Sequence, residues 1–276
     1  MSENVLTIEN ATMQFGGVVA VDNLNLKVDK DQIVSLIGPN GAGKTTTLKM
    51  LSGLAKPTSG SFSIFGCSKS ELASGGLFAK IGILIEEPGF YPDMSAYDNL
   101  RMKCILMGYN DAAYAHGLLD TVGLAGAARR KVKTFSMGMK QRLGIAMALV
   151  GNPEVLILDE PCAGLDPKGR DTILNLIKEY QSQMGNTVLF VSHSMEDVAK
   201  LCKKVIVMNK GKLAFCGSVN EVYSHGDELK KMGLNVPEIT DIFLKLKASG
   251  IDCRTDIYTV EQGVEEYKRL LAGGAY

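Results

Sequence analysis

Short apolar runs and longer segments of helical periodicity alternate along most of the chain. The candidate strands are the β-rich runs 5–8, 18–21, 24–28 and 33–37, followed by 81–85, 155–158, 188–191 and 205–208. The candidate helices are 45–52, 96–107, 112–122, 137–150, 168–183 and 195–201. Because the later strands are apolar throughout, they are typical of a mainly parallel sheet that is covered on both faces. The alternation predicts an α/β layered fold.

The character of the chain changes after Gly217, where it becomes more polar. Residues 222–276 have the pattern of short helices joined by turns at Gly226, Gly233, Pro237 and Gly250. We predict one large domain over residues 1–221 and a small C-terminal helical appendage over residues 222–276. Within the large domain we expect an antiparallel β subdomain and a helical subdomain at about residues 87–150.

Composition narrows the class of protein. The chain has 276 residues, of which 46% are hydrophobic, and it carries 30 basic and 30 acidic side chains. These values are ordinary for a globular protein with a large core, and they exclude disordered and fibrous classes. A net charge of zero gives no reason to expect nucleic acid as a partner.

The apolar runs are far shorter than the roughly 20 residues that cross a bilayer. The first residues are not a basic segment leading into an apolar stretch, so we expect no secretory signal and a cytosolic protein. The six cysteines form no C-x-x-C pair, which favours reduced structural thiols over a zinc site or a disulfide framework.

A glycine-rich loop follows the strand at residues 33–37. Its sequence is Gly38-Pro39-Asn40-Gly41-Ala42-Gly43-Lys44-Thr45-Thr46, which matches G-x-x-x-x-G-K-[ST] between a strand and a helix. The glycines let successive backbone N–H groups converge on phosphate oxygens at a helix N-terminus. We expect Lys44 to bind the β- and γ-phosphates and Thr45 to ligate Mg²⁺. The loop predicts a nucleoside triphosphate site that includes Gly38, Asn40, Gly41, Gly43 and Thr46.

Guanine-specific proteins carry an N-K-x-D motif. The nearest match is Asn209-Lys210-Gly211-Lys212, which has Lys at the position of the base-reading Asp. This difference disfavours a GTPase.

Two adjacent acids end the apolar run at residues 155–158. Asp159, at the strand tip, is placed to hold the Mg²⁺ water shell. Glu160 is placed to orient and deprotonate the attacking water as a general base. Together with the phosphate loop, this pair predicts nucleotide hydrolysis.

The run Phe135-Ser136-Met137-Gly138-Met139-Lys140-Gln141-Arg142 resembles the L-S-G-G-Q signature of the ABC ATPases. It departs from that signature at Phe135, Met137 and Met139, and it retains Ser136 and Gly138. The resemblance covers roughly residues 3–225, which implies the P-loop NTPase fold of that family.

The resemblance implies roles for further residues. Phe15 is similar to the aromatic residue that stacks on adenine, Gly164-Leu165-Asp166 resembles the D-loop, and His193 resembles the switch histidine. The family packs two such domains head to tail, with ATP and Mg²⁺ between the phosphate loop of one chain and the signature of the other. Ser136 and Gly138 would then donate hydrogen bonds to the γ-phosphate held by the partner, and Asp166 would lie at the same interface.

Glu86 occupies the position at which the family usually has the Q-loop glutamine. An ionised Glu accepts hydrogen bonds but cannot donate them, so its contacts to Mg²⁺ or water can persist while those donated by an amide cannot. The resemblance implies a metal-binding and catalytic role for Glu86.

The family resemblance also implies the partners: a second ATPase subunit, identical or different, and a transmembrane permease subunit. The protein would then be cytoplasmic and peripheral on the inner face of the cell membrane. An exposed apolar groove within residues 86–106 is the expected docking site for the permease.

Different parts of the chain resemble different subfamilies. Residues 5–48 resemble branched-chain amino acid importer ATPases, and the middle, with Gly89-Phe90-Tyr91-Pro92, resembles bacitracin and lantibiotic exporter ATPases. From Gly164 onward, including residues 232–240, the chain resembles energy-coupling-factor ATPases, in which such appendages can support ATPase pairing. A natural branch and a hybrid chain both fit this mosaic, and the middle and the tail favour different permease partners.

Two other functions compete with the transporter motor. A DNA-repair ATPase needs a long coiled-coil insertion and a ribosome-associated one needs two linked nucleotide domains, and neither pattern is present in this sequence. A regulatory subunit that binds ATP with weak hydrolysis is suggested by the altered signature and Glu86. The presence of Lys44, Asp159, Glu160 and His193 argues against it.

Overall fold

The computed structural model describes residues 4–68, 70–71, 76–85 and 89–272. Its centre is a six-stranded sheet in the order β10-β9-β3-β8-β7-β6. All neighbouring strands in it are parallel except β9 and β10, which form an antiparallel hairpin. The strands are β3 (Ile33–Ile37), β6 (Ile81–Leu84), β7 (Val155–Asp159), β8 (Thr187–Val191), β9 (Lys204–Asn209) and β10 (Lys212–Ser218). The prediction of an α/β fold with a mainly parallel core is confirmed.

A second, four-stranded antiparallel sheet has the order β2-β1-β4-β5. It contains β1 (Asn4–Phe15), β2 (Val18–Asp29), β4 (Ser59–Ile64) and β5 (Cys67–Ser68). The runs 18–21 and 24–28, expected as separate strands, form the single strand β2. The pairing register with β1 shifts near Asn10 and Asn23, which both adopt positive φ, so local bulges carry the strand through its polar middle.

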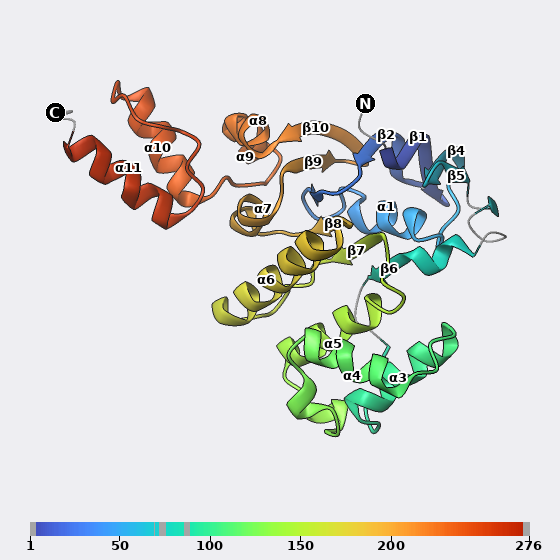
Figure 1. The fold of residues 1–276 in the computed structure, drawn as a ribbon. Helices are drawn as coiled ribbons and strands as arrows, with labels where there is room; N and C mark the ends of the chain where they lie inside the picture. The colour runs from blue at the N-terminus through green and yellow to red at the C-terminus, as the bar shows by residue number, and fades with distance from the viewer. Residues whose placement is uncertain (1–3, 69, 72–75, 86–88, 273–276) are drawn as a thin grey trace.

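The large sheet is covered on both faces, as Figure 1 shows. On one face, α1 (Lys44–Leu51) and the antiparallel sheet pack against alternate residues of the strands, such as Leu36 and Ile157. On the other face, α5 (Met137–Ala148), α6 (Pro167–Met184) and α7 (Met195–Leu201) pack against the intervening residues, such as Leu158 and Phe190. The two hydrophobic cores therefore lie on opposite sides of one sheet.

The helical subdomain consists of α3 (Ala96–Leu106), α4 (Ala112–Thr121) and the adjoining helix α5. The 3₁₀ helices Ala125–Ala127 and Val132–Thr134 lie between α4 and α5, and Leu77–Lys80 precedes β6. Ser95 begins α3 by accepting a hydrogen bond from the Asp98 N–H. Asn99 is buried, and its amide exchanges hydrogen bonds with the backbone of Tyr91, which fixes the segment that enters the subdomain.

The C-terminal part contains α8 (Val219–Ser224), α9 (Gly226–Lys231), α10 (Glu238–Ala248) and α11 (Val260–Ala272). Gly226, expected in a turn, begins α9. Side chains up to Val236 belong to the main core, whereas α10 and α11 enclose a separate cluster centred on Phe243. The two separate cores favour a domain boundary near Glu238. The boundary that we placed at residue 222 stays a prediction.

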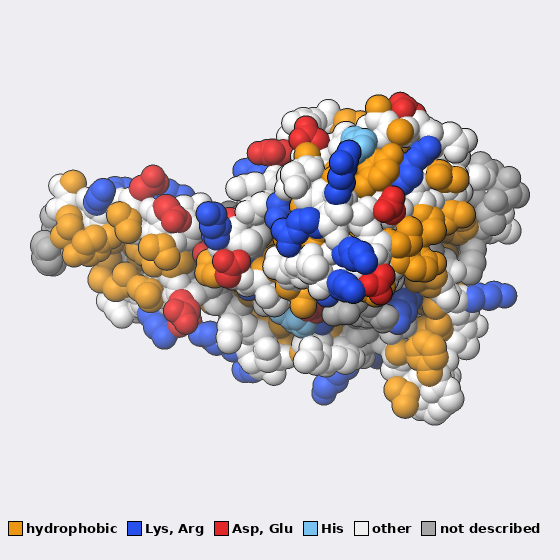
Figure 2. Space-filling model, turned by 90° about the horizontal axis from the view of Figure 1, so that it is seen from below, with side chains coloured by type: hydrophobic (Ala, Val, Ile, Leu, Met, Phe, Trp, Pro, Cys, Tyr) orange, Lys and Arg blue, Asp and Glu red, His pale blue; other side chains and the backbone are white. Residues whose placement is uncertain are grey.

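The α10–α11 hairpin projects from the body of the molecule, and Figure 2 shows hydrophobic side chains gathered on this lobe. Val260, Val264, Tyr267 and Leu271 form an exposed stripe along α11. None of the helices in the described part of the chain has the length and apolar character needed to span a bilayer.

Candidate active site

The phosphate loop curls around the side chain of its own lysine. Lys44 is 7% exposed, and its ammonium group donates hydrogen bonds to the carbonyl oxygens of Gly38 at 2.8 Å and Pro39 at 3.1 Å. Burial lowers the pKa of Lys44, while the nearby Glu160 and Asp159 raise it. The lysine charge is thus held at the start of α1, beside two acids and the backbone that would receive phosphate.

Glycine is required at the end of the loop. Gly43 has φ of +95°, and a Cβ atom there would lie 2.5 Å from the carbonyl oxygen of Ala20. The β1–β2 hairpin therefore lies directly against the phosphate loop. Phe15, at the end of β1 in the same hairpin, is 56% exposed, as expected for a ring that is free to stack on a base.

The β9–β10 turn braces the same loop from behind. The Gly211 N–H donates to the carbonyl oxygen of Ala42 at 3.1 Å, and the Asp22 N–H donates to the carbonyl oxygen of Gly211 at 2.9 Å. Lys210 and Gly211 both have positive φ, which is the pattern of a tight hairpin turn. We interpreted this Lys-Gly segment only as a possible guanine motif, although Lys-Gly between two apolar runs is also a signal for a hairpin.

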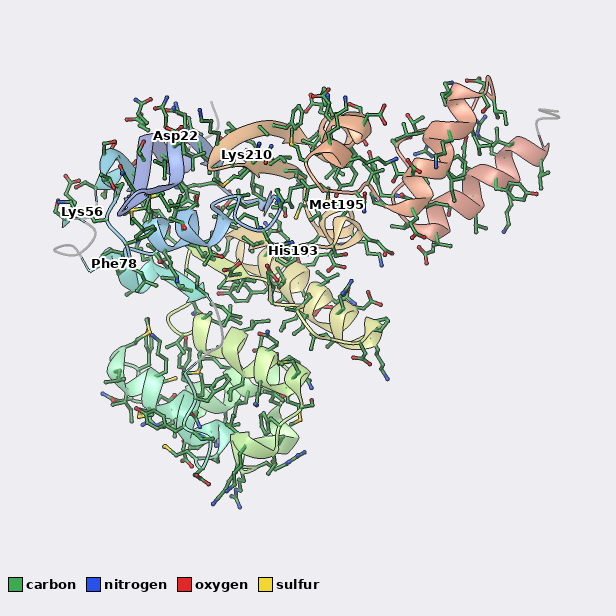
Figure 3. All side chains as sticks on the ribbon, turned by 180° about the vertical axis from the view of Figure 1, so that it is seen from behind. Asp22, Lys56, Phe78, His193, Met195 and Lys210 are labelled. Atoms are coloured by element: carbon green, nitrogen blue, oxygen red, sulfur yellow. The ribbon has the colours of Figure 1, made fainter. Side chains whose placement is uncertain are left out.

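The strand ends bring two functional pairs together. Thr45 Oγ1 donates a hydrogen bond to Asp159 Oδ2 at 3.1 Å, which joins the first turn of α1 to the tip of β7. Next to Asp159, the Glu160 carboxylate lies 2.6 Å from His193 Nε2. Glu160 adopts φ of +48°, and its N–H donates to the carbonyl oxygen of Val191 at 3.1 Å. This turn aims the carboxylate at the loop after β8, which carries His193 (Figure 3).

The signature and the D-loop meet on a different surface of the chain. Ser136 begins α5 by accepting a hydrogen bond from the Met139 N–H at 3.3 Å, and Asp166 begins α6 by accepting one from the Gly169 N–H at 3.1 Å. A Cβ atom at Gly138 would lie 3.5 Å from Leu165 Cδ2. Ser136, Gly138 and Asp166 line one open groove, which also contains Met137, Arg142, Gly164, Leu165, Lys168, Gly169 and Thr172.

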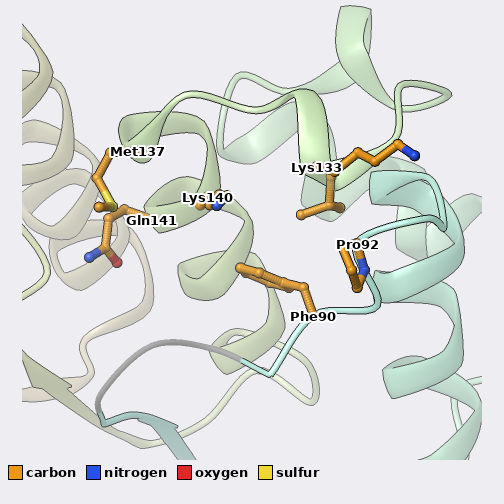
Figure 4. A pocket seen from close by; sticks show the side chains of 7 residues that line it. Phe90, Pro92, Lys133, Met137, Lys140 and Gln141 are labelled. Atoms are coloured by element: carbon orange, nitrogen blue, oxygen red, sulfur yellow. The ribbon is translucent and has the colours of Figure 1, made fainter.

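Met137 also lines a smaller pocket on the other side of the signature. Figure 4 shows this pocket, in which the Phe90 ring points towards α5 and Pro92 lies near Lys133. Lys133, Lys140 and Gln141 complete its polar rim. The signature thus separates this pocket from the D-loop groove.

The predicted site residues form three groups. Lys44, Thr45 and Asp159 lie together with Glu160 and His193, while Ser136, Gly138 and Asp166 form the second group and Phe15 lies on the hairpin. Of the other loop residues, Asn40 and Gly41 are exposed and Thr46 is half-buried in α1. Glu86 lies outside the described residues.

A phosphate loop between β3 and α1, with an acidic strand end beside it, defines a P-loop nucleoside triphosphatase. The chain belongs to the ABC transporter family, whose model matches residues 21–163. It is an ATP-binding subunit of this transporter class and an ATP hydrolase.

Relatives and a solved structure agree with this assignment. The chain is 35% identical to the energy-coupling factor transporter ATP-binding protein EcfA2 of Clostridioides difficile, over 98% of this chain and 97% of the relative. It is 34% identical to the bacitracin transport ATP-binding protein BcrA of Enterococcus faecalis, over 98% and 89%. It also matches the dimeric post-hydrolysis structure of the ATP-binding cassette MJ0796 bound to ADP and phosphate. That match has a TM-score of 0.70 and 27% identity over 78% of this chain and 98% of that one.

Proposed function

We propose that this chain hydrolyses ATP as one half of a head-to-tail dimer and thereby drives a transmembrane permease. The observation that carries the proposal is the pairing of Thr45 with Asp159 beside the pairing of Glu160 with His193. In this proposal, one chain supplies a phosphate-binding group, a metal-binding pair and a general base at neighbouring strand ends.

The separation of the two site groups supports a dimer. The groove that contains Ser136 and Gly138 is lined by no residue of the phosphate loop. An ATP molecule held by Lys44 of one chain would therefore receive its signature contacts from a second chain, a copy of this one or a related subunit. The dimeric state of the cassette structure matched above supports this arrangement.

The donor set near the phosphates suits Mg²⁺. The described residues contain no cluster of three or more metal-binding side chains. Mg²⁺ nevertheless prefers hard oxygen ligands and usually keeps several waters, with one or two protein ligands and the nucleotide phosphates. Thr45 Oγ1 and Asp159 Oδ2, which are 3.1 Å apart, fit that mode of binding. The ion would neutralise charge on the β- and γ-phosphates.

The remaining residues divide the chemistry among them. Glu160 would take a proton from the attacking water, and His193, in contact with Glu160, would orient this carboxylate. Lys44 would neutralise the transferred phosphoryl group, and Phe15 would stack on the adenine. For Glu86 we keep the metal-binding and catalytic role that the family resemblance implies.

A groove between the large sheet and the helical subdomain supports a permease partner. It is lined by Phe78, Ile83, Ile85, Gly89 and Met107, together with Ser52, Lys103 and Met147. Ile105 and Leu106, at the end of α3, are 49% and 79% exposed. We propose that a cytoplasmic segment of the permease binds there, which would place the protein at the inner face of the membrane.

The test compares ATP turnover by the wild type with that by Glu160→Gln. Removing the base should lower kcat at least about 100-fold while ATP binding remains. Glu154→Gln is the matched control, because Glu154 precedes the same strand and its carboxylate pairs with Lys80 at the surface. Normal turnover by Glu160→Gln would contradict the proposal. A wild type that binds ATP without turnover, alone and with a permease, would favour the regulatory alternative.

A further inference from the structure

An ion pair lies behind the loop that carries His193 and outside the groups assigned above. Arg170 belongs to α6 and Asp197 to α7, and Arg170 Nε lies 3.7 Å from Asp197 Oδ2. The Asp197 side chain is 3% exposed, so its charge depends on the neighbouring guanidinium. Burial raises the pKa of Asp197, and Arg170 is the largest influence that opposes this shift.

Both members of the pair also contact the residue that follows His193. Arg170 Nη1 donates a hydrogen bond to Ser194 Oγ at 3.4 Å, and the Asp197 N–H donates to the same oxygen at 3.2 Å. The Ser194 N–H in turn donates to Ser192 Oγ at 3.0 Å. His193 therefore lies between two hydrogen-bonded serines, and one of them, Ser194, is contacted by both members of the Arg170–Asp197 pair.

The other end of this connection is the D-loop. The Arg170 N–H donates to the carbonyl oxygen of Asp166 at 2.9 Å in the first turn of α6. Asp166 lines the groove that also contains Ser136 and Gly138. A chain that contacts this groove therefore touches the start of the helix from which Arg170 reaches Ser194.

The pair has room to tighten. Among the residues that the structure describes, Arg170 Nε and Asp197 Oδ2 are buried without a hydrogen-bond partner. Their separation of 3.7 Å exceeds the roughly 2.7–2.9 Å of a charge-assisted hydrogen bond. A small movement of α6 towards α7 would give both atoms that bond and would also move Ser194.

We propose that Arg170 and Asp197 are positioning residues that hold Ser194, and through it His193, in the orientation that contacts Glu160. Contact of a partner chain with the Asp166 end of α6 tightens the pair. The inference rests on the roles proposed above for Glu160 and His193, and it adds a path by which dimer formation promotes hydrolysis.

A second ion pair between the same helices provides a matched control. Lys200 Nζ lies 3.9 Å from Asp171 Oδ1, so this pair also joins α7 to α6. It lies at the exposed surface, where such pairs contribute little, and neither residue has a hydrogen bond to Ser194. If the Arg170–Asp197 pair served only to join the two helices, removing either ion pair would lower kcat by a similar factor.

The experiment measures kcat, the KM for ATP, ATP affinity and the melting temperature of Arg170→Gln, Asp197→Asn and Asp171→Asn. We expect kcat to fall about 10- to 100-fold in the first two, as for a misplaced catalytic group. ATP affinity and KM should stay within about twofold, because the phosphate loop is not touched. Asp171→Asn should keep kcat within about twofold.

Two further variants make the result decisive. Combining Arg170→Gln with Asp197→Asn should slow turnover no more than the worse single variant, because both act on one contact. If Arg170→Gln does not fold, Ser194→Ala removes the shared acceptor, which is also the N-cap of α7, and should lower kcat and the melting temperature while KM is unchanged. The inference would be overturned if Arg170→Gln or Asp197→Asn folds and keeps the wild-type kcat. It would also be overturned if Asp171→Asn lowers kcat as much as they do. A fully active Glu160→Gln would refute the proposed function itself. An inactive Glu160→Gln beside a fully active Arg170→Gln would refute only the positioning role.

Discussion

Gly43→Ala tests whether the β1–β2 hairpin determines the shape of the phosphate loop. The added methyl group would lie 2.5 Å from the carbonyl oxygen of Ala20 and 3.2 Å from Val21 Cγ2, in a residue with φ of +95°. The left-handed backbone costs alanine about 1–2 kcal/mol, and overpacking costs about 1–3 kcal/mol. Reduced freedom of the unfolded chain offsets about 0.4–1 kcal/mol. We expect the free energy of unfolding to fall by about 1–4.5 kcal/mol.

The same substitution should weaken ATP binding. Relief of the clash requires the loop to move away from Ala20, which displaces the N–H groups that face the phosphates. A loss of about 1.4 kcal/mol in binding is a tenfold loss of affinity, so we expect at least a tenfold rise in Kd. Urea unfolding gives the stability, and titration with a fluorescent ATP analogue gives the affinity.

Two glycines separate the contributions. Gly41 has φ of +77°, but a methyl group added there would meet no atom within 4 Å. Gly41→Ala should therefore show only the cost of the left-handed backbone, about 1–2 kcal/mol before the gain from reduced freedom of the unfolded chain is subtracted. Gly117 lies inside α4 with open space around it, so Gly117→Ala should stabilise the protein by about 0.5–1 kcal/mol. If Gly43→Ala loses no more stability than Gly41→Ala, the close approach of Ala20 does not constrain the loop.

Other predictions concern the C-terminal part. Arg269 holds the pKa of Glu266 at about 2, below the unfolded value, so the stability from Glu266 is present above about pH 4.3 and is lost as the pH falls towards 2. Glu266→Gln should lower the free energy of unfolding by about 1–2 kcal/mol near pH 7, after allowance for the solvent-exposed Arg269, and should speed proteolysis of α11. The control Glu265→Gln, at the exposed neighbouring position, should change neither the stability nor the proteolysis rate. Tyr223→Phe removes a 2.7 Å hydrogen bond to the carbonyl oxygen of Met195 and should lower the melting temperature, at a cost of about 1 kcal/mol, without changing ATP affinity. An unchanged melting temperature would show that this bond contributes nothing.

The sequence predicted the features that depend on local pattern. The positions of the parallel strands along the chain, the phosphate loop and the acids at 159 and 160 are set by a few adjacent residues, and the fold confirms the α/β prediction, whereas the order of the strands in the sheet was not predicted. β4 was not predicted because its sequence, Ser-Gly-Ser-Phe-Ser-Ile, is mostly polar and exposed. It is a strand because β1 supplies its hydrogen-bond partners, as Leu6 pairs with Ile64.

Long-range contacts could not be predicted from the sequence. Gly211 supports Ala42 through a hydrogen bond between segments that are far apart in the chain, and no local pattern around Gly211 points to Ala42. Arg170 and Asp197 are individually ordinary charged residues of two helices, and the burial of Asp197 and the contact of Arg170 with Ser194 arise only when α6 packs on α7. Such contacts depend on tertiary packing, which no periodicity of residues encodes.

The most direct test of the head-to-tail site is the mass of the Glu160→Gln protein, measured by light scattering with Mg²⁺ and either ATP or ADP. We expect dimers in ATP and monomers in ADP, because the uncleaved γ-phosphate joins the phosphate loop of one chain to Ser136 and Gly138 of the other. Adding Gly138→Asp should place a carboxylate against that phosphate and abolish pairing, while ATP affinity of the single chain is unchanged. Dimers that persist in the double variant, or Glu160→Gln chains that stay monomeric in ATP, would contradict the head-to-tail site.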